Sequence, residues 1–172
     1  MFRIFVSEIY EIQDCTVAND CTTNSIENVF SVPSALKNST YGFSSDGWKF
    51  GNAGGWTDVP MAISYPTLPF EVAFKITELS YQGLTLNLGK NGNTWKSFIS
   101  NNPQNIIFCG TNIGAVSYNS DYAIKVYSDK IELYCDGTLI TTHNTGLTTV
   151  QLMWGTGQDR IIRVKDFKIK PL

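Results

Sequence analysis

Three carboxylates near the start of the chain are the first candidates for chemistry. The stretch "SEIYEIQD" places Glu8, Glu11 and Asp14 at intervals of three residues. Glycoside hydrolysis needs two carboxyl groups about 5 to 9.5 Å apart, which on a strand means residues i and i+2 of one face. At a spacing of three, Glu11 would point away from Glu8 and Asp14. The spacing therefore favours solvated charges over a catalytic pair, and we predict no catalytic residue and no enzyme.

The remaining polar motifs do not form a reactive site either. His143 is the single histidine and follows a strand-like run in "THNTG", where we expect an ordinary loop residue. The glycine-rich stretches "GKNGN" and "GNAGG" lack the strand–loop–helix frame of a phosphate loop, so they are interpreted as turns. No D-x-D-x-D-G calcium loop occurs. We expect no cofactor and no metal, with "SSDG" and the surroundings of Asp166 as the remaining places for Ca²⁺.

Four cysteines leave one pairing open. Cys15 and Cys21 are separated by the five residues "TVAND" and fit either free thiols or a bridge in an exported protein. Cys135 shares the parity of the apolar residues of its strand, so it should face the core. In "NIIFCG" we expect Ile106 and Phe108 to face the core. Cys109 has the opposite parity and should therefore face outward. Cysteines on opposite faces cannot form a disulfide, so we predict that both stay free and that Cys109 reacts more readily.

The tryptophans offer the best candidates for binding. Trp154 shares its parity with the apolar residues of "VQLMW" and should lie in the core, whereas three others stand beside turns in "DGWKF", "GGWTD" and "NTWKS". A partly exposed indole can stack on a sugar ring while nearby Asn and Asp bind its hydroxyl groups. The alternative is that these indoles cap the open ends of a sandwich. The predicted ligand-binding residues are Trp48, Trp56, Trp95, Asp46, Asn93 and Asp58.

Composition excludes several classes of partner. The chain has 172 residues, a net charge of -2 and a pI near 5.3, which argues against nucleic acid. No window approaches the roughly 18 apolar residues of a membrane span, and "MFRIFV" is too short for a signal peptide. We expect synthesis in a cytoplasm, unless the product is cut from a longer chain. The even composition predicts one domain over residues 1–172, with 1–12 as a first strand or an N-terminal arm.

The elements that must position these residues are strands. Apolar and polar residues alternate with a period of two in "FEVAFKI", "LTLNL" and "YAIKVYS". Between such runs lie clusters of Gly, Asn, Asp, Pro and Ser, which are typical of turns. Only "VFSVPSALKN" could hold a short helical turn. The pattern predicts an all-β protein, an antiparallel sandwich of jelly-roll type with almost no helix.

Two consecutive hairpins are expected in "DYAIKVYSDKIELYCDGTLITTH". A two-residue turn at Ser128–Asp129 would place the apolar residues of its strands opposite one another and Lys125 opposite Glu132 as an ion pair. Asp136–Gly137 predicts a type I′ turn, in which both central residues take positive φ. That geometry accounts for the Asp-Gly without a ligand.

The last strand, "RIIRVKDFKIK", contains a change of phase. Ile162 and Val164 share one parity, and Phe167 and Ile169 share the other. One strand can bury all four only if a bulge near Lys165–Asp166 shifts the alternation by one residue.

The elements "LYCDG", "WGTGQDR" and "VKDFKI" together resemble the C-terminal half of concanavalin A-like lectin/glucanase domains, which include laminin G-like sandwiches. The resemblance covers residues 68 to 172 best. It implies a jelly roll that binds sugars, and versions like this one are similar to modules in phage and archaeal-virus tail and surface proteins. The glucanase pattern Glu-x-Asp-x-x-Glu is absent.

The resemblance thus predicts a non-catalytic binding or adhesion module for cell-surface glycans, displayed on a virion or other surface assembly beside neighbouring chains. The alternatives are a purely structural coat, tail or fibre component, and a glycan-cleaving enzyme. Neither nucleic acid nor a membrane is expected as a partner.

Overall fold

The described part of the chain is built of strands. A computed structural model describes residues 42–44, 47–52, 57–60, 67–79, 84–101, 105–156 and 160–172, with the backbone alone for strands β1 to β3. Thirteen strands and no helix occur in these ranges, so no described helix could span a membrane. The expected helical turn at 29–38, the arm at 1–12, the carboxylates of "SEIYEIQD", Cys15 and Cys21 lie outside the described residues.

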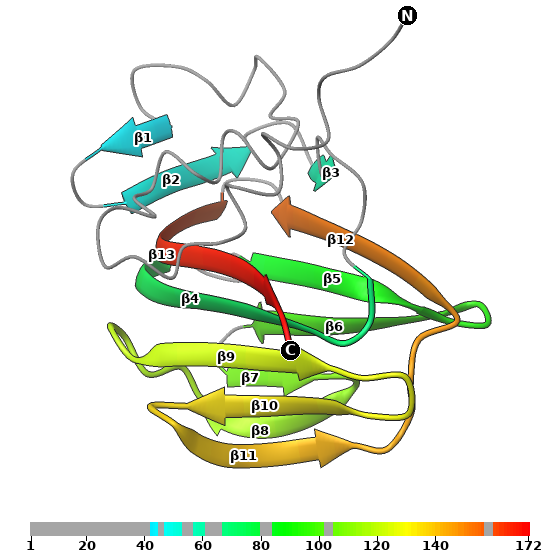
Figure 1. Ribbon diagram of the computed structural model, residues 1–172. Helices are drawn as coiled ribbons and strands as arrows, with labels where there is room; N and C mark the ends of the chain where they lie inside the picture. The colour runs from blue at the N-terminus through cyan, green and yellow to red at the C-terminus, as the bar shows by residue number, and fades with distance from the viewer. Residues whose placement is uncertain are drawn as a thin grey trace, which may run out of the picture.

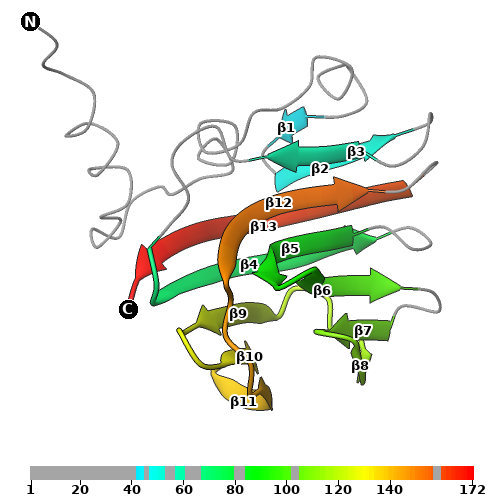
Figure 2. The ribbon, with the colours of Figure 1, turned by 90° about the vertical axis from the view of Figure 1, so that its right-hand side faces the viewer.

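Two antiparallel sheets lie face to face, as Figure 1 shows from the front and Figure 2 after a turn of 90°. The seven-stranded sheet has the spatial order β1 (Gly42–Ser44), β2 (Gly47–Asn52), β13 (Arg160–Pro171), β4 (Phe70–Leu79), β9 (Asp121–Val126), β10 (Ile131–Cys135) and β11 (Thr138–His143). The six-stranded sheet has the order β3 (Thr57–Pro60), β12 (Thr149–Thr156), β5 (Leu84–Asn91), β6 (Thr94–Asn101), β7 (Asn105–Phe108) and β8 (Thr111–Ala115). Neighbours far apart in sequence, such as β4 and β13, make this the predicted jelly-roll sandwich.

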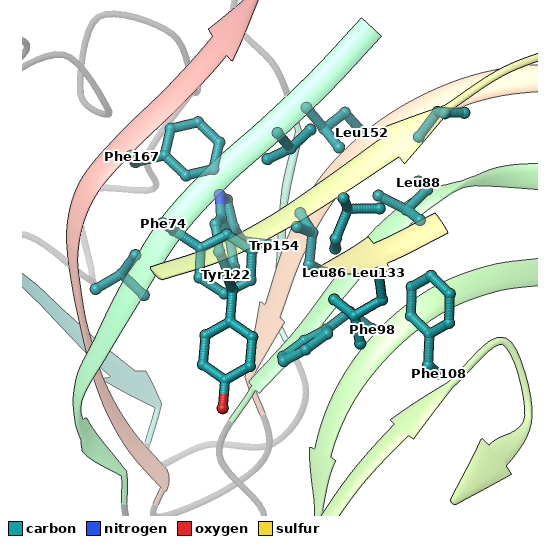
Figure 3. Close-up of a cluster of buried hydrophobic side chains, with 14 of the residues drawn as sticks. Phe74, Leu86, Leu88, Phe98, Phe108, Tyr122, Leu133, Leu152, Trp154 and Phe167 are labelled. Carbon is teal, nitrogen blue, oxygen red and sulfur yellow. The ribbon is translucent and has the colours of Figure 1, made fainter. Parts of the chain in front are cut away.

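The core forms where the inward residues of the two sheets meet. Strand β4 shows the predicted alternation, with Phe70, Val72, Phe74 and Ile76 buried and the residues between them only partly so. The six-stranded sheet contributes large side chains from the opposite side, and Figure 3 shows the two sets interdigitating. Burial of this apolar surface is the main force that holds the sheets together.

Phe74 is the centre of an aromatic cluster in this core (Figure 3). Its ring centroid lies 5.4 Å from that of Phe98, 5.8 Å from that of Tyr122 and 5.5 Å from that of Trp154. Trp154, predicted to be a core residue, is fully buried and also contacts Phe167 edge-to-face at 5.3 Å. The cluster links β4, β6, β9, β12 and β13, so it joins both sheets.

The two predicted hairpins are confirmed. Lys125 is the Cα partner of Glu132, and the apolar residues of β9 and β10 pair as expected. Asp136 and Gly137 take φ of 49° and 76°, as a type I′ turn requires.

The prediction that Lys125 forms an ion pair with Glu132 is wrong. The Glu132 carboxylate forms its ion pair with Lys130, whose Nζ lies 2.6 Å away, and accepts a hydrogen bond from Tyr134 Oη at 2.9 Å. Lys125 instead places its Nζ 4.5 Å from the centre of the Tyr134 ring. The hydrogen bond from Lys130 lowers the pKa of Glu132, and Lys125 adds to the effect through its charge. The backbone register was predictable, but the choice among several lysines depends on rotamers.

The bulge in the last strand is confirmed as well. The register of β13 against β4 shifts between Lys165 and Lys168, and Asp166 takes φ of 53°. Val164 and Phe167 are both buried as a result, and Ile169 packs partly buried against the core, whereas the side chain of Ile162 is outside the described part of the chain. The Asp166 carboxylate, considered for calcium, lies 3.3 Å from Lys75 Nζ in an ion pair.

Candidate functional site

Short polar residues occupy the outer face of the six-stranded sheet. Leu86 and Leu88 of β5 and Phe98 of β6 point into the core. Their sequence neighbours Thr85, Asn87 and Ser97 therefore face outward. Sequence alternation predicted a wet face here. Thr85 and Asn87 on β5 and Ser97 on β6 are instead only 7%, 8% and 8% exposed.

Longer neighbours explain this burial. Asn87 has Met153 of β12 as a Cα partner on one side and Ser97 of β6 on the other, while Thr85 has Ile99 beside it. Directly opposed residues share a face, so the larger Met153 and Ile99 side chains flank the shorter polar ones. Non-local strand pairing therefore decides how much of each polar side chain solvent reaches.

The hydrogen-bonding groups of Thr85, Asn87 and Ser97 are unused within the described structure. No hydrogen bond joins any of the three side chains to another described residue, and none of their polar atoms is among the fully enclosed unpartnered ones. Two hydroxyls and an amide on adjacent strands can both donate and accept. Such a set is suited to a ligand with several hydroxyl groups.

Trp95 extends this polar set along β6. It lies two residues before Ser97, hence on the same face about 7 Å along the strand. Its Cα partner across the strands is Lys90, whose Nζ lies 4.5 Å from the centre of the indole ring. We call Thr85, Asn87, Lys90, Trp95 and Ser97 the β5–β6 face.

A bulge brings Lys90 to this face. Leu88 is fully buried, so regular alternation would also turn Lys90 inward. The register between β5 and β6 shifts between Asn87 and Gly89, which reverses the phase. Gly89 takes φ of 152°, and a Cβ there would collide with the carbonyl oxygen of Thr149. The glycine thus permits both the bulge and the close approach of β12.

The structure places the sequence-predicted binding residues in different parts of the molecule. Trp95 belongs to the β5–β6 face, and Asn93 lies exposed in the turn that joins β5 to β6. Asp58 lies in the edge strand β3, opposite Gly155 of β12. Trp48 lies in β2 of the other sheet, opposite Val164. Trp56 and Asp46 fall outside the described residues.

The residues that sequence reasoning missed are Thr85, Asn87, Lys90 and Ser97. The polar alternation of "LTLNL" was a signal for Thr85 and Asn87, but it was interpreted only as solvent exposure, and this stretch does not contain Lys90 or Ser97.

The acidic side chains that the structure describes are distributed unevenly between the sheets. Every carboxylate whose side chain is described lies on the seven-stranded sheet or in its turns: Glu71, Glu78, Asp121, Asp129, Glu132, Asp136 and Asp166. Several are engaged in ion pairs with neighbouring lysines or Arg163. Within the described residues, no group of His, Cys, Asp and Glu is placed to hold a metal ion. The β5–β6 face therefore offers hydroxyl, amide, indole and ammonium groups.

His143 differs from its predicted setting. It ends strand β11 opposite Ile131, instead of lying in a loop. Its Nε2 is enclosed and has no hydrogen-bond partner in the described structure. Burial, with a smaller contribution from the charge of Lys96, lowers the pKa of His143, so the neutral form is favoured.

The facing predicted for Cys109 is wrong, although both thiols are free as predicted. Ile106 and Phe108 point inward as expected, but β7 ends at Phe108 and Cys109 takes φ of 49° in the following turn. The chain leaves the strand alternation there, and Cys109 packs against the core. Cys135 also packs against the core, as predicted.

The order of thiol reactivity should therefore be the reverse of the one that alternation predicts. Burial raises the pKa of Cys109 to about 11, and burial also raises the pKa of Cys135. Because the thiolate is the reactive form, we expect a maleimide at pH 8 to label Cys135 before Cys109. Mass spectrometry of peptides from timed samples measures both rates, with the denatured chain as the reference for equal reactivity. Faster labelling of Cys109 would contradict the burial described here.

Comparison with known proteins shows the fold. No family model and no curated protein matches the sequence. Among solved structures, the Crh5 transglycosylase in complex with NAG has a TM-score of 0.56 at 9% identity, over 80% of this chain and 77% of that one. The carbohydrate-binding module CBM66 from Bacillus subtilis has a TM-score of 0.53 at 12% identity, over 77% of this chain and 91% of the module. A sialidase has a TM-score of 0.54 at 9% identity over 71% of this chain, which spans 15% of that protein.

These likenesses confirm the predicted antiparallel β-sandwich fold. The likeness at this level of identity shows the fold, which is found both in a carbohydrate-binding module and in a transglycosylase.

Proposed function

We propose that this chain is a non-catalytic glycan-binding module and that the β5–β6 face is its binding site. The observation that carries the proposal is the coincidence of an indole with three screened, unpaired polar side chains on two adjacent strands. The C–H face of a pyranose can stack on Trp95, while Thr85, Asn87 and Ser97 hydrogen-bond its hydroxyl groups. Partial screening from water strengthens such hydrogen bonds.

Two facts support binding over cleavage. The sequence lacks the alternating acidic strand of glucanases, and the described carboxylate side chains are on the other sheet. Hydrolysis by the common two-carboxylate mechanism needs both acids beside the scissile bond. The enzyme alternative is tested by incubation with mixed polysaccharides and detection of new reducing ends, which we expect not to appear.

Trp95→Ala should weaken glycan binding at least about fivefold, because a central aromatic anchor contributes more than about 1 kcal/mol to a typical site. A glycan array identifies ligands for the wild-type chain, and calorimetry then compares the variants. The matched control is Tyr127→Ala, in the β9–β10 turn of the seven-stranded sheet. It removes a half-buried aromatic ring whose centre lies 4.9 Å from Lys130 Nζ. Asn87→Ala should also weaken binding. An array without hits, or equal loss in both aromatic variants, would refute the proposed site.

Display on a virion, which the sequence resemblance implied, stays a prediction. So does the structural alternative, for which the relevant feature is the edge strand β11. Its Leu139 and Ile140 are 48% and 44% exposed, and neighbouring chains of an assembly could cover them. The genes that flank the coding sequence test the virion context directly.

A further inference from the structure

The lysine on the β5–β6 face, like Lys125 on the opposite sheet, makes a cation–π contact and lacks, among the described residues, the ion pair that four other cations of that sheet make. On the seven-stranded sheet, Lys75, Lys130, Arg163 and Lys170 each lie within 3.3 Å of a carboxylate oxygen. Lys90 makes no ion pair with a described residue. Its ammonium lies 4.5 Å from the centre of the Trp95 ring.

This arrangement is built by the backbone. The bulge at Asn87–Gly89 turns Lys90 outward, and the bulge depends on a glycine pressed against Thr149. The Lys90 carbonyl accepts hydrogen bonds from the Thr148 backbone N–H at 2.8 Å and from Thr148 Oγ1 at 3.1 Å. Thr148 thus fixes the Lys90 backbone on one side and the pairing with Trp95 of β6 fixes it on the other, while the cation–π contact holds the side chain at the indole.

Among the residues whose side chains the structure describes, no carboxylate compensates the charge of Lys90. The described acidic side chains are on the other sheet or in its turns. A positive charge beside a water-poor polar surface attracts anions. A neutral sugar stacked on Trp95 would leave the ammonium without a partner, whereas a charged one would form a charge-assisted hydrogen bond.

We propose that the preferred ligand is an acidic glycan, whose anionic group binds Lys90 while its ring contacts Trp95. This inference rests on the proposed function and names the ligand class of the same site. The anionic group is a hexuronate carboxylate or a sulfate ester, which share the chemistry that Lys90 would recognise. Thr85, Asn87 and Ser97 then bind the hydroxyl groups of the same or the adjoining residue.

Charged and neutral forms of the same backbone test the proposal. Oligogalacturonate is compared with its methyl ester, and dextran sulfate with dextran, by calorimetry at 50 and 300 mM NaCl. We expect at least one anionic member to bind about tenfold or more tightly than its neutral partner, because a hydrogen bond to a charged group contributes roughly 1.5 to 3 kcal/mol. The advantage should shrink at the higher salt concentration. The two pairs distinguish carboxylate from sulfate.

Variants tie the effect to Lys90. Lys90→Met keeps the aliphatic stem and should abolish the advantage of the anionic member, and Lys90→Arg should retain it. The matched control is Lys125→Met, which removes an ammonium 4.5 Å from the Tyr134 ring on the other sheet and should change nothing. Equal affinity for charged and neutral members, or an unchanged preference in Lys90→Met, overturns the acidic-glycan inference. Neutral array ligands that depend on Trp95 would then leave the proposed function standing, whereas a chain that binds no glycan at all refutes both.

Discussion

Phe74→Ala is expected to lower the free energy of unfolding by about 4 kcal/mol, the middle of the usual range for loss of a buried aromatic ring. Phe74 is 1% exposed and contacts Phe98, Tyr122 and Trp154. Removal of its ring leaves a cavity among three other rings from both sheets, which cannot all move to fill it. Urea denaturation followed by tryptophan fluorescence measures the change.

Leu139→Ala is the control for the Phe74 experiment. Leu139 is 48% exposed on the edge strand β11, so its truncation should change stability by less than about 0.5 kcal/mol. If Phe74→Ala does not fold, Phe74→Leu keeps most of the volume and should cost roughly 1 to 2 kcal/mol. A loss below 1 kcal/mol for Phe74→Ala would contradict the central place of this ring.

Local rules predicted much of this fold. The turn at Asp136–Gly137 and the pairing of Lys125 with Glu132 follow from a few adjacent residues whose backbone preferences are strong. The bulge near Asp166 followed from a conflict of parity, because no regular strand could bury both Val164 and Phe167. In each case one short stretch contained all the information.

The binding face depends on contacts that a single strand does not reveal. The sequence "LTLNLGKN" gives no parity conflict, so the bulge before Gly89 was not predicted and Lys90 was not recognised as a partner of Trp95. The screening of Asn87 depends on Met153, which follows it by more than sixty positions in the chain. Alternation distinguishes two faces of a strand, but the neighbouring strands decide how deeply each side chain is buried.

Cys109 illustrates a second reason for failure. Its predicted facing assumed that β7 continues to residue 109, whereas the chain turns there with a positive φ. A non-glycine residue rarely adopts this conformation, so its sequence gave little warning. The tight turn allows β8 to pair with β7. It also allows the Cys109 N–H to donate a hydrogen bond to the Ser97 carbonyl at 2.8 Å.

The connection from β11 to β12 is the second place where one substitution should have a large effect. It crosses from one sheet to the other, and it is fastened to the β5–β6 turn (Figure 2). Asn91 Nδ2 donates to the Gly146 carbonyl at 3.0 Å, and the Gly92 N–H donates to Thr148 Oγ1 at 3.0 Å. The other side of Gly146 lies against the backbone of Ser128 in the β9–β10 turn.

Gly146→Ala should therefore lower the free energy of unfolding by roughly 3 kcal/mol, at the upper end of the usual cost of overpacking. The added Cβ would collide with the Ser128 carbonyl oxygen and carbon, which are backbone atoms and cannot rotate away. The matched control is Gly92→Ala, where φ is +57° but no atom lies within 4 Å of the new Cβ. In that variant the free energy of unfolding should fall only by the cost of placing an alanine in the left-handed backbone region, about 1 kcal/mol. Urea denaturation of both chains gives the comparison, and a Gly92 variant less stable than the Gly146 variant would show that the connection can shift away from Ser128.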